Sequence, residues 1–355
     1  MCWPGYRRSV EHPQFMQVRR AVRRALADVV GGGEADPLVL VGVSGGADSL
    51  ALAAALSAEA EAAGALAGAL VVDHGLQPHS ADVAQRAAGQ AESFGLDPVV
   101  VRRVSVRADG GPEAAARAAR YDAFASVASA HGAAAVLTAH TRDDQAEQVL
   151  LGLARGSGTR SIAGIPVARA LTESTRLLRP LLDPALDITR ATTVAACVEL
   201  GLEPWQDPHN QDPGYARVRV RETVLPLLVE QLGEGVRAGL ARSADLARED
   251  ALALDEWADR VLRELGSAEQ PGGVVVLGPE SIGALTAVPA AIRQRVIHRI
   301  AAEHFGANLS RQHTLALARL VTDWRGRGPA FVPGIRATRT REALTLAPQL
   351  TSPRG

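Results

Sequence analysis

The sequence predicts an α/β fold, in which a parallel sheet covered by helices is followed by a mainly helical C-terminal domain. From residue 38 to about 155, short β-branched apolar runs alternate with longer runs rich in alanine and leucine. A chain of 355 residues is long for one domain. Because residues 230–269 are acid-rich with helical periodicity, we place a first domain at 1–220 and a second at 221–355.

Each element follows from its apolar pattern. Residues 14–30 form an amphipathic helix whose arginines, at positions 19, 20, 23 and 24, are either a solvated face or an RNA contact. Strands are then expected near 38–43, 66–72, 98–104 and 134–139, and helices near 49–63, 80–95, 112–131 and 144–155. Later helices are expected after Asp187 and over 230–269, 288–303 and 311–322, with Leu240, Leu246, Leu252, Leu254, Trp257 and Leu262 in the core.

The first expected strand runs into a loop formed by Ser44, Gly45, Gly46, Ala47, Asp48 and Ser49, and a helix follows at once. Glycine adopts dihedrals closed to other residues and lets a ligand approach the main chain. The free N–H groups of such a turn and of the first helical residues, together with the helix dipole, bind anions, most often phosphate. A glycine turn alone is common before a helix, but this longer pattern between strand and helix predicts a phosphate-binding loop.

The chain contains no lysine, so all of its basic side chains other than histidine are arginines. Phosphate loops of the Gly-x-x-x-x-Gly-Lys type need a lysine that reaches the outer phosphates. Its absence excludes that class of kinase, as well as Schiff-base chemistry and ligases that carry AMP on a lysine. The phosphate-binding loop is therefore of another kind.

Polar residues follow two of the expected strands. Ligands of parallel sheets bind at the carboxyl ends of the strands, so these side chains are expected at one edge. Acidic residues are also favoured in any first helical turn by the dipole. Several carboxylates beside a histidine exceed what capping needs, and they predict a site for magnesium, an ammonium group, or both. The residues are Asp73 and His74 after the second strand, and His140, Asp143, Asp144 and Glu147 after the fourth.

Arginines outside this edge are candidates for phosphate contacts. Arg117 and Arg120 lie one turn apart on the helix between strands three and four, and we favour Arg120 for a phosphate of the ligand. The glycine-rich loop from 155 to 179 carries five arginines against Glu173 alone, and residues from 301 onward carry eight against three acids. Both segments are interpreted as RNA contacts or as solvated surface.

The overall composition excludes several other classes of protein. The net charge of −1 gives no global nucleic-acid signature, and two cysteines form neither a disulfide framework nor a metal site. No apolar run would span a bilayer, and the N-terminus lacks the apolar core of a signal peptide. We therefore expect a cytoplasmic protein without a membrane partner, and a homodimer remains open.

The motifs resemble those of the PP-loop ATP pyrophosphatases, an adenine nucleotide α-hydrolase-like fold, and within them the tRNA(Ile)-lysidine synthases. The resemblance covers most of residues 38–230, and its least specific mark is the loop at 44–49. The discriminating stretches are His-Thr-Arg-Asp-Asp-Gln-Ala-Glu at 140–147 and Asp-Pro-His-Asn at 207–210. The family pattern usually has Ser where this chain has His209 and Asn where it has Val218.

The resemblance implies a reaction and its participants. ATP would adenylate O2 of the wobble cytidine in a tRNA(Ile) with a CAU anticodon, and the ε-amine of free L-lysine would then displace AMP from C2. The loop from Ser44 to Ser49, with Asp73 and His74, would hold ATP. Asp48 and Asp144 would hold Mg²⁺. The catalytic residues implied are Asp48, Asp144, Glu147, His140 and Arg120.

Three alternatives are weighed at this point. A 2-thiocytidine synthetase shares the loop but needs cysteines, and this chain has only Cys2 and Cys197. Amidotransferase-coupled synthetases need a domain with a nucleophilic cysteine. A non-catalytic ATP-binding module would need no carboxylate cluster, and an assay of pyrophosphate release would separate it from an enzyme.

Overall fold

The computed structural model describes residues 12–31, 36–75, 79–105, 112–156, 158–207, 212–265, 268–326 and 328–349. The chain forms two compact units, which divide between Arg248 and Glu249. The expected boundary at 220 falls instead within a continuous helical run, formed by α8 (Ala216–Arg219), the π-helical turn η3 (Val220–Val224) and α9 (Leu225–Leu232). Since Val220 and Leu225 pack against Ala146, this run belongs to the first unit.

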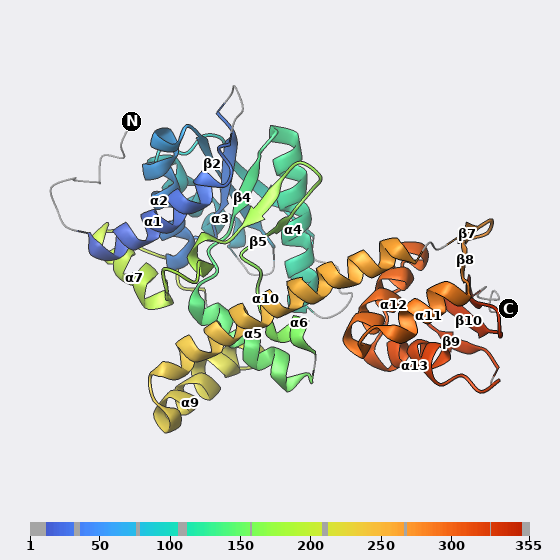
Figure 1. Cartoon of the computed structure of the whole chain (residues 1–355). Coiled ribbons are helices and arrows are strands. Elements are labelled where there is room, and N and C mark those ends of the chain that lie inside the picture. Colours follow the sequence, from blue (N-terminus) through green and yellow to red (C-terminus); the bar gives the residue numbers. More distant parts are fainter. Residues whose placement is uncertain are drawn as a thin grey trace. The chain divides into compact units, whose positions relative to one another are not determined.

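The first unit is built on a six-stranded sheet of order β3-β2-β1-β4-β6-β5 (Figure 1). Five strands are parallel, and β5 pairs with β6 in the antiparallel sense. The four expected strands are confirmed, whereas β5 and β6 were not predicted because each has three residues and carries an arginine. The strands are β1 (Leu38–Gly42), β2 (Leu66–Asp73), β3 (Val99–Arg103), β4 (Ala135–Leu137), β5 (Ala168–Ala170) and β6 (Arg176–Leu178).

Helices cover both faces of the sheet (Figure 1). Alternate strand residues pack against these opposite helical layers. Val39 and Val41 of β1 face α1, α2, α3 and α7, while Leu40 faces α4 through Phe124. The sheet is therefore buried on both faces, as its apolar strands predict. The helices of this unit, besides those named above, are α1 (Pro13–Ala27), α2 (Ala47–Ala63), α3 (Ser80–Ser93), α4 (Pro112–His131), α5 (Arg142–Ala154), α6 (Thr159–Ile162) and α7 (Arg190–Glu199), with a 3₁₀ turn η1 at Pro180–Leu182.

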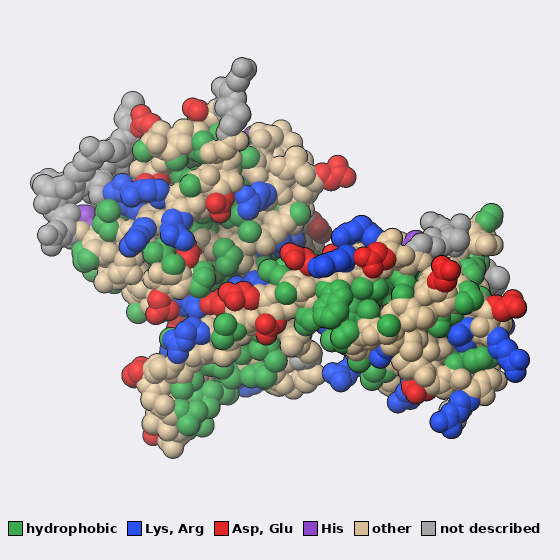
Figure 2. Space-filling model, viewed as in Figure 1, with side chains coloured by type: hydrophobic (Ala, Val, Ile, Leu, Met, Phe, Trp, Pro, Cys, Tyr) green, Lys and Arg blue, Asp and Glu red, His purple; other side chains and the backbone are tan. Residues whose placement is uncertain are grey.

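Figure 2 shows the basic side chains of α1 gathered on one face of the first unit. Arg19 and Arg23 both bond the buried carboxylate of Glu59, with Nε–O distances of 2.6 and 2.7 Å. Arg24 Nε lies 2.6 Å from an oxygen of Asp183. These three arginines hold α1 to its neighbours, so a structural role accounts for most of this basic face.

The second unit combines helices with an antiparallel sheet of order β7-β8-β11-β10-β9. Its helical character was expected, but the sheet was not. Leu254 and Leu262 pack against its core as expected, whereas Leu252 and Trp257 are exposed. Leu246, which belongs to the first unit, is exposed as well. No helix in the described part of the chain is long and apolar enough to cross a membrane. The elements are α10 (Gly235–Glu264), which begins in the first unit, α11 (Pro279–Ala287), α12 (Ala290–Phe305), α13 (Arg311–Thr322), β7 (Ala268–Gln270), β8 (Val274–Leu277), β9 (Ala330–Val332), β10 (Ile335–Arg339) and β11 (Leu344–Pro348).

Candidate active site

The loop between β1 and α2 is shaped as a cradle for an anion. Gly45 has φ of +83°, a conformation that side chains disfavour. Ser49 Oγ accepts from the Ser44 amide at 3.1 Å and donates to the Gly46 carbonyl at 2.9 Å, which fixes the turn. Gly46 caps α2 without a side-chain hydrogen bond, so the first amides of α2 are left for a ligand.

Asp48, in the first turn of α2, is held in place by residues of α7. Thr193 Oγ1 donates a hydrogen bond to Asp48 Oδ1, and Arg190 Nε lies 3.9 Å from Oδ2. The Asp48 side chain is 26% exposed, so it is accessible from the ligand side. Burial raises the pKa of Asp48 to about 6, which outweighs the opposite effects of Thr193 and Arg190.

This raised pKa gives a testable dependence of stability on pH. The carboxyl is protonated in both states below its ordinary pKa of 3.8, and between 3.8 and about 6 only the unfolded chain loses the proton. The contribution of Asp48 to stability therefore falls as pH rises through this window. Asp48→Asn stays neutral and keeps an oxygen for Thr193. We expect its urea midpoint to match wild type near pH 4 and to exceed it at pH 7; an equal difference at both pH values would contradict the assignment.

Asp144 is positioned by the start of α5. Its Oδ2 accepts from the backbone N–H of Thr141 at 2.8 Å and from the Thr141 hydroxyl at 3.1 Å, a capping box that fixes the rotamer. Oδ1 accepts from Arg217 Nη2 at 3.0 Å and Arg190 Nη2 at 3.2 Å. Burial alone would raise the pKa of Asp144, but the charges of Arg217 and Arg190 lower it by more. The net shift is downward, so the carboxyl stays ionised.

Glu147 lies one turn further along α5 and is fully buried. Its carboxylate accepts from Arg217 Nε and from Arg221 Nε, each at 2.7 Å, and from Arg190 Nη2 at 3.3 Å. Arg217 and Arg221 come from α8 and the following π-helical turn, and they lie one helical turn apart. Three guanidinium groups thus balance the carboxylates of Asp48, Asp144 and Glu147.

The structure brings together most of the predicted site residues, but Asp143 does not join them. Asp143 instead accepts from the backbone N–H of Arg190 at 2.7 Å, at the start of α7, and faces Arg237 at 3.4 Å. The sequence did not predict the role of Arg190. More than 40 residues separate it from Asp144 and Glu147, and no local sequence pattern indicates such a contact. The one available signal was chemical: a buried carboxylate pair needs cations, and this chain can supply only arginine or histidine.

The two histidines are neutral at pH 7. Burial lowers the pKa of His140, whose Nδ1 lies 3.3 Å from Thr138 Oγ1. Burial and the charge of Arg120 lower the pKa of His74 to about 4. Arg120 Nε donates to His74 Nε2 at 3.4 Å, so the proton of His74 is on Nδ1. Asp73, at the end of β2, accepts from the Gly75 amide at 2.9 Å.

Asp48 and Asp144 carry oxygen donors of the kind that Mg²⁺ prefers. Arg190 lies between them, 3.9 Å from Asp48 and 3.2 Å from Asp144. A guanidinium therefore stands where a cation shared by the two carboxylates would stand. Within the described ranges no group of three or more His, Cys, Asp or Glu is arranged to hold a metal.

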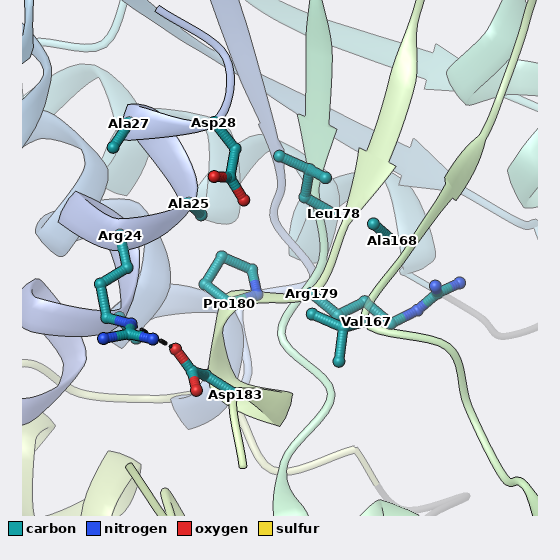
Figure 3. A pocket seen from close by; sticks show the side chains of 11 residues that line it. Arg24, Ala25, Ala27, Asp28, Val167, Ala168, Leu178, Arg179, Pro180 and Asp183 are labelled. Atoms are coloured by element: carbon teal, nitrogen blue, oxygen red, sulfur yellow. Dashed lines mark hydrogen bonds and ion pairs between the residues drawn. The ribbon is translucent and has the colours of Figure 1, made fainter. Parts of the chain in front are cut away.

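A separate cavity of about 270 Å³ lies between α1 and the β5–β6 hairpin (Figure 3). Its lining includes Ala25, Leu178 and the ion pair of Arg24 with Asp183. The side chain of Arg179 points away from this hollow, as Figure 3 shows. None of the carboxylates of Asp48, Asp144 and Glu147 lines it, so it is distinct from the candidate site.

Comparisons with known proteins place the chain in a family. Residues 16–228 match the model of the PP-loop domain. The tRNA(Ile)-lysidine synthase of Leifsonia xyli is 55% identical over 88% of this chain and 90% of that protein, and the one of Salinispora tropica is 51% identical over 94% and 96%. A U34-tRNA thiolase from Methanococcus maripaludis has the same fold, with a TM-score of 0.53 at 19% identity, covering 70% of this chain and 88% of that one. The chain belongs to the tRNA(Ile)-lysidine synthase family of PP-loop proteins.

Proposed function

We propose that the protein joins free L-lysine to C2 of the wobble cytidine in tRNA(Ile) with a CAU anticodon, forming lysidine, AMP and pyrophosphate. The observation that carries this proposal is the pair Asp144 and Glu147, set beside a phosphate-binding loop and neutralised by three arginines. A module that only binds ATP has no need of buried carboxylates. The relatives at up to 55% identity support the same reaction.

ATP binds at the loop between β1 and α2. The amides of the loop and of the α2 N-terminus, with the hydroxyls of Ser44 and Ser49, hold the β- and γ-phosphates. The cytidine O2 attacks the α-phosphorus, an O–P bond forms, and pyrophosphate leaves. Arg120, beside His74, stabilises the charge that develops on the phosphates. Magnesium held by Asp48 and Asp144 would neutralise phosphate charge while ATP is bound.

Lysine binds through its ε-ammonium at Glu147 and Asp144. Adding this cation to a cluster with three carboxylates and three guanidiniums creates an excess charge, so one arginine must give way. Arg190 is the most exposed of the three, at 29% against 20% for Arg217 and 21% for Arg221, and leaves most easily. The ammonium passes its proton to a carboxylate of the cluster, and the free amine attacks C2 and expels AMP.

Pyrophosphate release tests the first half of this reaction. We expect ATP–pyrophosphate exchange that depends on tRNA(Ile) and persists without lysine, because the adenylate forms first. Transcripts that differ only at the wobble base provide the control, and uridine at that position should abolish exchange. Exchange without tRNA would show that the adenylate forms on another acceptor.

The 2-thiocytidine alternative is disfavoured by the cysteine chemistry. Cys197 donates a hydrogen bond to the Ala47 carbonyl at 3.4 Å, and burial raises its pKa to about 12, so it is not a thiolate at pH 7. Cys2 is the only other cysteine of the chain and lies outside the described residues. We place the protein in the cytoplasm, where its tRNA and free lysine are found, and keep a homodimer as a proposal that gel filtration would test.

A further inference from the structure

Tyr121 of α4 is enclosed by three arginines from different elements. The guanidinium of Arg169, on β5, lies 4.7 Å from the centre of the Tyr121 ring, and that of Arg117, on α4, lies 5.2 Å from it. Arg179, directly after β6, donates from Nη2 to the Tyr121 hydroxyl at 3.2 Å. We call these four residues the Tyr121 stack. Cation–π contacts of this kind fix the direction of a guanidinium.

The arginines of the Tyr121 stack are not neutralised by a carboxylate of the described residues. In the described part of the chain, none of Arg117, Arg169 and Arg179 forms an ion pair with a carboxylate, whereas the arginines around Glu147 are all paired. Arg179 is 1% exposed, donates from Nη1 to the Pro166 carbonyl at 2.7 Å, and has no partner for Nε. Gathered like charges are costly unless an anion neutralises them. The stack therefore attracts a partner that carries negative charge.

An anion bound at the Tyr121 stack would lie apart from the ATP site. In the sheet, β4 and β6 lie between β1, which carries the ATP loop, and β5, which carries Arg169. At about 4.8 Å per strand, β5 lies roughly 14 Å from β1. Arg117 and Arg179 both lower the pKa of His140, so the stack nevertheless borders the reacting site. Arg117 and Arg169 are also exposed to solvent.

We propose that the Tyr121 stack binds a backbone phosphate of the RNA, next to the nucleotide held in the active site; this rests on the proposed function. Arg117 and Arg169 contact the phosphate, Tyr121 holds both guanidiniums in place, and Arg179 positions Tyr121. A phosphate contact beside the flipped nucleotide sets the register of the RNA without reading its sequence. The stack thereby positions the wobble base for attack on ATP.

The test uses the full-length protein with Arg117→Gln, Arg169→Gln and the control Arg102→Gln. Arg102 is an exposed arginine on β3, at the opposite end of the sheet, so its loss changes the net charge equally. We expect each stack variant to weaken tRNA binding about tenfold. The slope of log K against log salt should flatten by about 0.7 to 0.9 per lost contact, with ATP affinity unchanged. Arg102→Gln should alter neither.

Tyr121 variants test the role of the ring. Tyr121→Phe keeps the stacked ring and should bind tRNA within about twofold of wild type, whereas Tyr121→Leu should behave like the arginine variants. Loss of ATP affinity with unchanged tRNA affinity would assign the stack to the nucleotide and overturn the proposal. Unchanged slopes in both arginine variants would also overturn it. Lysidine formation by the wild-type protein is measured separately. If lysidine forms but the stack variants bind tRNA normally, only the proposal for the stack is wrong; if no lysidine forms, the proposed function is wrong.

Discussion

Replacing Asp48 with alanine is expected to reduce pyrophosphate release by about 10³-fold or more, while the protein stays folded. The residue lies in the first turn of α2, directly after the phosphate-binding loop, and its carboxylate faces Arg190 and Thr193 at the ligand side. In the proposed mechanism, its loss removes the negative charge that would hold magnesium beside the phosphates. Single-turnover release of pyrophosphate from ATP with tRNA(Ile) measures the effect.

Asp183→Ala is the matched control for Asp48. Asp183 also pairs with an arginine, Arg24, and it lines the separate cavity beside α1 rather than the candidate site. This control should keep near-normal turnover, and thermal unfolding should show both variants folded. An Asp48→Ala protein that turns over ATP at the wild-type rate would remove Asp48 from the reaction.

Glu147→Gln should cost both stability and lysine binding. The glutamate is fully buried and is shared by Arg190, Arg217 and Arg221, so its neutralisation leaves buried guanidiniums without their anion. Breaking a buried ion pair in this way typically costs about 3–5 kcal/mol of unfolding free energy. The KM for lysine should rise far more than the KM for ATP, because the proposed mechanism places the substrate ammonium at Glu147.

Glu59→Gln separates the two effects. Glu59 is likewise buried and is shared by Arg19 and Arg23, but it lies on the opposite end of α2 from the site. This variant should lose stability without a selective change in the KM for lysine. If Glu147→Gln instead raises both KM values equally, Glu147 belongs to the magnesium site rather than the lysine site.

The sequence predicted the parts of this fold that rest on local pattern. The strand and helix alternation from β1 to α5 was predictable because apolar periodicity and the Ser44–Ser49 loop are encoded within a few residues. Short edge strands such as β5 carry no such signal, because pairing with β6 decides their conformation. The sheet of the second unit was missed for a related reason: its partners are far apart in the chain, as in the pairing of β8 with β11.

The residues of the candidate site also differ in whether local sequence could predict them. Asp144 and Glu147 could be proposed from the end of a strand and the start of a helix, and Asp48 from the resemblance of its loop to the PP-loop. Their pairing with Arg190, Arg217 and Arg221 could not, because it depends on where α7 and α8 pack. Likewise, the sequence assigns the arginines of the loop at 155–179 together to RNA contacts or solvated surface, but Arg179 is buried against Tyr121.

The most direct test of the function is transfer of labelled lysine to tRNA. Purified protein, ATP and radiolabelled L-lysine would be incubated with tRNA(Ile) transcripts that carry either cytidine or uridine at the wobble position. We predict one lysine attached per cytidine transcript, with one AMP released per lysine and the modified nucleoside identified by mass spectrometry. The uridine transcript should remain unlabelled. Release of AMP and pyrophosphate without attachment of lysine, or equal labelling of both transcripts, would contradict the assignment.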